Sequence, residues 1–146
     1  MQKITPFLWF DGKAEEAANF YCSVFKNSKL LQVTPMISVF EIEGQKFMAL
    51  NGGPQFKFTE AVSLFVECET QNEVDYYWNN LTGDGGSESM CGWLKDKYGL
   101  SWQIIPNALM KLMSSTAPKK SQAVIQAMLK MKKIVINDLE QAYNSN

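Results

Sequence analysis

The order of strand-like and helix-like segments repeats along this chain, and the repeat limits the folds that it can adopt. Residues 3–10 alternate in polarity and are rich in β-forming side chains; a helix-like segment and three short strand-like segments follow. The same order starts again at residue 61. A period of about 2 residues indicates a strand, and a period of about 3.6 residues indicates a helix. The sequence therefore predicts strand, helix and three strands, twice, in one α+β domain.

The first repeat is recognised by its breaks as well as by its periodicity. Asp11-Gly12 ends the first strand, and Asp11 is a candidate N-cap for the helix after it. That helix has one apolar face, made of Ala14, Ala17, Ala18, Tyr21, Val24 and Phe25. We expect the following strands at residues 30–34, 36–42 and 45–50. Asn51-Gly52-Gly53-Pro54 then has the composition of a loop.

The second repeat contains a capping box and a hairpin. An apolar strand is predicted at residues 61–68, and Thr70 with Glu73 forms a capping box that starts a helix. The stretch Cys91 to Pro106 alternates on both sides of Asp96-Lys97-Tyr98-Gly99. Asp at the start and Gly at the end of this tetrapeptide are typical of a tight turn. We therefore expect two antiparallel strands at the end of the second repeat.

The residues after 106 change character and favour helices. Pro118 suits a first helical position, and Val124, Met128, Met131 and Val135 recur at near-helical spacing. Asn137 and Glu140 form a second candidate capping box, which predicts a short helix at residues 138–143. This tail is expected to cover a sheet or to contact a partner.

Two residue types are missing, and their absence excludes several kinds of site. There is no histidine, and all 14 basic residues are lysine. Catalysis by Ser-His-Asp or Cys-His is therefore impossible, as is a zinc site that needs imidazole. Without arginine, no planar guanidinium can bind a carboxylate or phosphate through two parallel bonds. An anion would have to be held by lysine or by backbone N–H groups.

Composition also narrows the partners and the compartment. A net charge of −1 gives no general attraction to nucleic acid. No segment is apolar over the roughly 20 residues that a bilayer span requires. Cys22, Cys68 and Cys91 lie far apart, in no metal-binding spacing, and no apolar leader precedes the first strand. These features favour a reducing cytoplasm, without a membrane or nucleic-acid partner.

Several motifs resemble one protein family. They are ITPFLWFDGKAEEAANFY, GQKFMALNGGP, CGWLKDKYGLSWQIIP and the tail segment KMKKIVINDLEQAY. Together they are similar to the PhnB-like branch of the vicinal-oxygen-chelate superfamily, which includes glyoxalases, bleomycin resistance proteins and extradiol dioxygenases. The resemblance implies two βαβββ modules that form a cupped, mostly antiparallel sheet with outer helices. It places module one at about 1–54, module two at about 59–106 and a C-terminal helical tail at about 107–146, within a single domain at 1–146.

The same resemblance locates the metal-ligand positions of the related enzymes. By motif register these positions are Thr5, Ala49, Ser63 and Gln103. Only Gln103 offers a good ligand atom for a metal ion, and none of the four side chains carries a negative charge. Divalent cations prefer carboxylate, several oxygens, imidazole or thiolate. We therefore predict that there is neither a metal at this site nor another cofactor.

Alternation along the strands then assigns other side chains to the concave face of the cup. The predicted ligand-binding residues are Thr5, Phe7, Trp9, Phe47, Asn51, Ser63, Phe65, Cys91, Trp93 and Gln103. An aromatic pocket with few polar groups is typical of a small-molecule site, although core packing is the commoner role for buried aromatics. Glu67 and Lys95 are a candidate acid/base pair, and the loop at residues 51–54 is expected at the cavity mouth. No catalytic residue is assigned.

Three functional hypotheses remain open at this point. The first is a metal-free, homodimeric protein that binds an apolar or aromatic small molecule in the cup. The second is an enzyme of lyase, isomerase or dioxygenase type, or the demethylubiquinone methyltransferase after which this branch is often labelled. Against methyl transfer, the chain has no glycine-rich loop after a first strand. The third is a dimeric interaction module whose tail methionines (Met110, Met113, Met128 and Met131) contact a partner.

Overall fold

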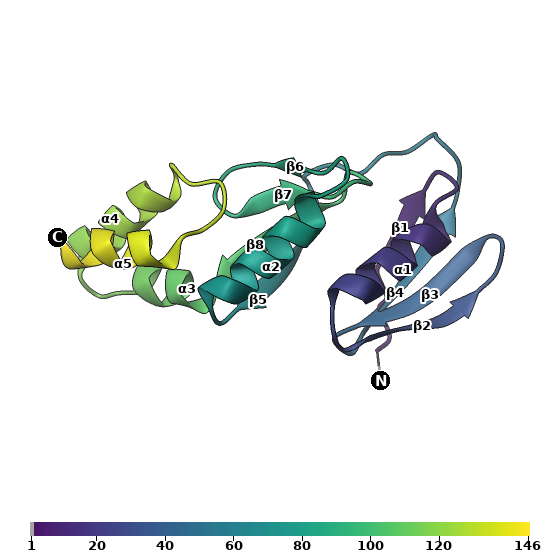
Figure 1. Cartoon of the computed structure of the whole chain (residues 1–146), viewed down its shortest axis with the longest axis horizontal. Helices are drawn as coiled ribbons and strands as arrows, with labels where there is room; N and C mark the ends of the chain where they lie inside the picture. The colour runs from purple at the N-terminus through teal and green to yellow at the C-terminus, as the bar shows by residue number, and fades with distance from the viewer. Residues whose placement is uncertain (1) are drawn as a thin grey trace. The chain divides into compact units, whose positions relative to one another are not determined.

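The computed structural model describes residues 2–146, which form two compact units. The first unit ends at Phe58, and the second runs from Thr59 to Asn146. Each contains a four-stranded sheet with a helix along one face (Figure 1). Among the described residues, none of the helices has both the length and the apolar character needed to cross a membrane.

The first unit follows the predicted order. Its elements are β1 (Phe7–Phe10), α1 (Ala14–Val24), β2 (Ser28–Val33), β3 (Ile37–Ile42) and β4 (Gln45–Asn51). The strands lie in the order β1-β4-β3-β2, with β1 parallel to β4 and the other pairs antiparallel. The first strand is shorter than predicted, because residues 3–6 precede the paired segment. The parallel β1–β4 pair is possible because α1, β2 and β3 separate these strands in the chain.

The core of this unit lies between α1 and one face of its sheet. The predicted helical face is buried, and Tyr21 of α1 stacks on Phe40 of β3, which stacks on Phe47 of β4. Leu8 and Phe10 of β1 complete this core. The small side chains of Ala14, Ala17 and Ala18 are fully buried, so the helix backbone can approach the sheet closely.

The start of α1 is held by a residue from β4, and the prediction that Asp11 caps this helix is wrong. Lys13 occupies the N-cap position and makes no side-chain cap bond. Instead, the N–H of Ala14 donates to Asn51 Oδ1 at 2.8 Å, and Asn51 Nδ2 donates to the carbonyl of Pro35 at 3.0 Å. The side chain of Asn51 thus connects the helix to the end of the sheet.

The second unit repeats the arrangement. Its first elements are β5 (Ser63–Cys68), α2 (Gln71–Thr82), β6 (Ser87–Glu88), β7 (Trp93–Lys95) and β8 (Ser101–Pro106). The strand order is β5-β8-β7-β6, with β5 parallel to β8. The predicted capping box is present: Thr70 Oγ1 accepts from the N–H of Glu73, whose carboxylate accepts from the N–H of Glu69. The buried stripe of α2 consists of Val74, Trp78 and Leu81.

The predicted hairpin joins β7 to β8, and Asp96 organises its turn. The Asp96 side chain is only 2% exposed. Its Oδ1 accepts from the N–H groups of Tyr98 at 2.9 Å and Leu100 at 3.1 Å, and its Oδ2 accepts from Trp102 Nε1 at 2.9 Å. Gly99 adopts φ +86°, a conformation that is costly for other residues. The turn is therefore built around a buried carboxylate.

Three helices form the tail: α3 (Asn107–Met113), α4 (Pro118–Met128) and α5 (Ile136–Asn144). Pro118 begins α4 as predicted. The second predicted capping box is wrong, since α5 begins at Ile136 and its N-cap, Val135, makes no side-chain bond. The tail has its own core, made of Ile105, Leu109, Val124, Ile134 and Leu139. Met113, Met128 and Met131 pack against that core, whereas Met110 is exposed.

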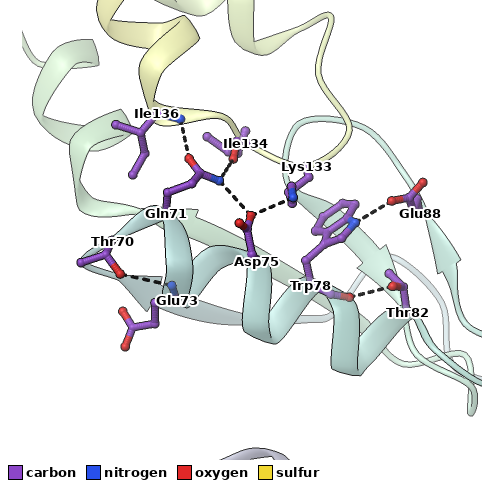
Figure 2. A network of polar contacts seen from close by, with 10 residues as sticks. All are labelled: Thr70, Gln71, Glu73, Asp75, Trp78, Thr82, Glu88, Lys133, Ile134 and Ile136. Carbon is purple, nitrogen blue, oxygen red and sulfur yellow. Dashed lines mark hydrogen bonds and ion pairs between the residues drawn. The ribbon is translucent and has the colours of Figure 1, made fainter.

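A polar network attaches the tail to α2 (Figure 2). The side-chain amide of Gln71 donates to the carbonyl of Ile134 at 2.9 Å and accepts from the N–H of Ile136 at 2.8 Å. It thus makes the two backbone hydrogen bonds that a neighbouring strand would make. Asp75 pairs with Lys133 at 2.7 Å, and the hydrogen bond from Lys133 lowers the pKa of Asp75. The tail segment 133–136 is therefore held against α2.

Candidate functional site

One face of the second sheet combines polar and aromatic side chains. The register pairs Ser63 with Ser101, Phe65 with Gln103, and Trp93 with Gln103. Residues paired in this way point to the same side of a sheet. The intervening side chains, Leu94, Trp102 and Ile104, are buried on the α2 side. We call the opposite side the polar-aromatic face; it consists of Ser63, Phe65, Trp93, Lys95, Ser101 and Gln103.

Gln103 lies at the centre of this face. On β8 it has Phe65 on one neighbouring strand and Trp93 on the other. Its Nε2 donates to Ser63 Oγ at 2.9 Å, so two residues predicted from the sequence are in direct contact. Phe65 is 48% exposed. An amide between two aromatic side chains can orient a planar compound that packs on the rings.

A cavity of about 260 Å³ opens next to this centre. Side chains from β6, β7 and β8 line it together with Glu60, which precedes β5. Lys95 Nζ pairs with Glu60 Oε1 at 2.9 Å, and the hydrogen bond from Lys95 lowers the pKa of Glu60. The predicted pairing of Lys95 with Glu67 is therefore wrong, because Glu60 occupies that position. No pattern in the sequence pointed to Glu60, which lies outside any periodic segment.

Ser101 presents an unpartnered hydroxyl in the same cavity. The residue is 1% exposed, and within residues 2–146 its Oγ has no hydrogen-bond partner. A buried polar group without a partner costs about 1–3 kcal/mol. Ser101 is not among the binding residues predicted above. Alternation along β8 places it on the same face as Gln103, but alternation cannot show that the hydroxyl is both buried and unpaired.

Phe7 and Trp9 form part of an apolar face in the first unit. The register pairs Phe7 with Met48 and Trp9 with Leu50, so these four side chains share the side opposite α1. The indole N–H of Trp9 donates to the carbonyl of Gly53 at 2.9 Å. A side chain at Gly52 would overlap the same indole. The predicted loop 51–54 therefore packs on Trp9, which explains Gly52, while the φ of +94° explains Gly53.

Phe47, Ala49 and Asn51 lie on the other side of this sheet, so their predicted grouping with Phe7 and Trp9 is wrong. The register pairs Leu8 with Ala49, and Leu8 is buried toward α1. Phe47 stacks in the core, and both polar atoms of the Asn51 side chain are used by Ala14 and Pro35. The error is a shift of one residue, which moves every side chain of a strand to the opposite face.

The two remaining predicted residues lie outside strands. Thr5 is half-buried and precedes β1. Cys91 is half-buried in the turn before β7, where it adopts φ +60°, and its N–H donates to the carbonyl of Met131 at 2.8 Å. Burial raises the pKa of the Cys68 thiol to about 12, helped by the charge of Glu73, and burial also raises the pKa of Cys22. Cys22 and Cys68 are therefore poor nucleophiles.

The residues at the predicted metal positions do not fit a divalent cation. Ala49 has no donor and faces α1, while the Gln103 amide is hydrogen-bonded to Ser63. Within residues 2–146 no group of three or more His, Cys, Asp or Glu side chains is arranged to hold a metal ion. Uncharged hydroxyls and a single amide are weak ligands for such ions.

Comparison with known proteins identifies the family. A family model described as 3-demethylubiquinone-9 3-methyltransferase matches residues 2–105. The chain belongs to this family, the PhnB-like branch of the vicinal-oxygen-chelate superfamily. A PhnB protein from Bacillus cereus, described as a putative 3-demethylubiquinone-9 3-methyltransferase, is 39% identical with a TM-score of 0.67; the match covers 72% of this chain and 99% of that one. The family model ends before α3, so the tail helices lie outside the matched region.

More distant structures share the fold. A protein from Pseudomonas aeruginosa is 20% identical with a TM-score of 0.61, covering 73% of this chain and 98% of its own. The fosfomycin resistance protein FosX from Listeria monocytogenes, solved with Mn(II) and sulfate, is 13% identical with a TM-score of 0.52, covering 70% and 88%. No curated protein matches the chain. These two structures show that the fold is shared.

Proposed function

We propose that this protein binds a small aromatic or apolar organic molecule on the polar-aromatic face without a metal ion. The observation that carries the proposal is that Gln103, which is hydrogen-bonded to Ser63, lies between Phe65 and Trp93 on the neighbouring strands. Rings on both sides supply apolar area, and the amide and hydroxyl fix the orientation of a polar substituent. The name of the family is not by itself evidence of methyl transfer, because the described residues form no nucleotide-binding βαβ unit.

A thermal-shift panel of small aromatic compounds tests this proposal. A ligand at 100 times its Kd stabilises the native state by about 2.7 kcal/mol. For a chain of this length, that energy raises the Tm by about 5–10 °C. We expect such a rise for at least one compound, in the presence of a metal chelator. S-adenosylmethionine belongs in the panel, and stabilisation by it instead of the aromatic compounds would favour the methyltransferase hypothesis.

Substitution of Gln103 shows whether the ligand lies on the proposed face. Gln103→Leu removes the amide, and we expect the affinity for the best compound to fall at least about tenfold, the equivalent of about 1.4 kcal/mol. Gln45→Leu is the matched control, since Gln45 is an exposed strand residue of the first unit. Equal affinities in the two variants, or no stabilisation by any compound, would contradict the proposal.

We also propose that the protein is a homodimer that functions in a reducing cytoplasm. Large apolar side chains are exposed in both units, including Phe7 at 51% and Val62 at 66%. Extensive exposed apolar surface usually marks an interface. Cys22, Cys68 and Cys91 are all free thiols. Light scattering should give twice the mass of the chain, and the mass of a single chain would contradict the dimer.

A further inference from the structure

The polar-aromatic face is divided into two rows that cross the strands. One row contains Phe65, Gln103 and Trp93. The adjacent row runs Ser63, Ser101, Lys95 and Ser87, so three hydroxyls accompany a single ammonium group. Residues two apart on a strand are separated by about 7 Å. This spacing suits a small molecule with a ring on the first row and a polar head on the second.

The second row is rich in donors. The ammonium of Lys95 carries three N–H donors, and the structure gives one ion pair to it, from Glu60. The buried hydroxyl of Ser101, the neighbour of Lys95 in the row, has no partner within residues 2–146. Both groups line the same cavity. Glu60 therefore takes up one of the donors of Lys95, and the Ser101 hydroxyl lacks a partner among the described residues.

Glu60 has the properties of a replaceable carboxylate. Its side chain is 64% exposed, so it can return to water at little cost. The hydrogen bond from Lys95 holds the pKa of Glu60 below its usual value, and the group is ionised at neutral pH. The carboxylate of Glu60 thus already pairs with the ammonium of Lys95, at a distance of 2.9 Å.

Two other acidic residues of the second unit lie near this position, and neither forms an ion pair with Lys95. Glu88 also lines the cavity, but its Oε2 accepts from Trp78 Nε1 at 2.6 Å (Figure 2). Glu67 lies beyond Phe65 on β5, opposite Ile105 and away from the Lys95 row. Lys95 and Glu60 therefore form the ion pair of this cavity, and Glu88 is a second carboxylate in its lining that is bonded to Trp78.

We propose that the ligand is a small aryl carboxylate, whose carboxylate replaces Glu60 at Lys95 and accepts a hydrogen bond from Ser101. The ring then packs on the row of Phe65, Gln103 and Trp93. This inference rests on the function proposed above and specifies the chemical class of its ligand. No covalent bond is formed or broken, because the ligand is held by an ion pair, a hydrogen bond and ring contacts.

Matched pairs of compounds test the inference. Calorimetry would compare aryl carboxylates, such as benzoate and phenylacetate, with their primary amides, which have the same shape and no charge. We expect the wild-type protein to bind a carboxylate at least about tenfold more tightly than its amide, because a charge-assisted bond is stronger than a neutral one. Lys95→Met should abolish the preference but retain binding of the amide, and Glu60→Gln should tighten carboxylate binding severalfold by removing the competitor.

Lys97→Met is the control, since Lys97 lies in the same hairpin but contacts the ring of Tyr98. This variant should keep the wild-type preference. If both compounds of a pair bind equally well to the wild type and Gln103→Leu weakens both, the carboxylate inference is wrong and the proposed function stands. A preference for the amides over the carboxylates would also overturn the inference. If neither member of any pair binds, the carboxylate inference is wrong, and the proposed function is then also wrong if no compound of the thermal-shift panel stabilises the protein.

Discussion

Asp96→Ala should destabilise the protein by about 3–4 kcal/mol, one of the two largest effects that we expect. The substitution leaves three donors without an acceptor: the N–H groups of Tyr98 and Leu100 and the indole N–H of Trp102. The site is nearly inaccessible to water, so solvent cannot replace the lost bonds without rearrangement. Urea unfolding followed by far-UV circular dichroism would measure the loss.

Two further variants isolate the role of the buried carboxylate. Asp96→Asn keeps the shape and one acceptor oxygen but places a donor near Trp102. We therefore expect it to lose less stability than Asp96→Ala and more than the control below. Asp11→Ala changes an exposed aspartate in a turn and should alter stability by less than about 0.5 kcal/mol. If Asp96→Ala were as stable as Asp11→Ala, the account of the hairpin turn would be wrong.

Gly92→Ala should also be strongly destabilising, by about 2–4 kcal/mol, because it combines backbone strain with overpacking. Gly92 adopts φ +84°, and an added Cβ would lie 2.7 Å from Ile105 Cδ1 and 3.1 Å from both the Ile104 carbonyl oxygen and Ile134 Cγ1. Its N–H donates to the carbonyl of Lys132. The substitution should therefore loosen the tail as well, which limited proteolysis followed by mass spectrometry would detect.

Gly99→Ala provides a closely matched control. Gly99 has nearly the same φ, +86°, but an added Cβ would meet no atom within 4 Å. We expect its cost to be about 1–2 kcal/mol, from the backbone alone. The difference between the two variants measures the packing of the tail against the glycine. Equal losses in both, with cleavage in the tail unchanged, would mean that the tail does not depend on this contact.

Local signals in the sequence were sufficient for much of the fold. The hairpin was predictable because alternation on both arms and the Asp–Gly turn chemistry agree. The α2 capping box was predictable because its two partners are three residues apart. The cap of α1 was not predictable in this way: Asn51 lies 37 residues from Ala14 and becomes its neighbour only after the sheet has formed.

The candidate site was predictable in the second unit and only in part in the first. Ser63 and Gln103 were placed together because β5 and β8 pair in the expected register. In the first unit, a shift of one residue placed Ala49 on the wrong face, because nothing local in the strand fixes which alternate set of side chains faces α1. Glu60 could not be found, because irregular segments carry no periodicity that orients their side chains.

Nuclear magnetic resonance tests metal-free binding on the polar-aromatic face most directly. The best aromatic ligand from the panel would be titrated into the protein in a buffer that contains a metal chelator. The account predicts saturable shifts of the Gln103 side-chain amide and the Trp93 indole N–H, with little change for the Trp9 indole, which is bound to Gly53. Binding that occurs only after a divalent cation is added, or shifts that leave Gln103 and Trp93 unchanged, would contradict the account.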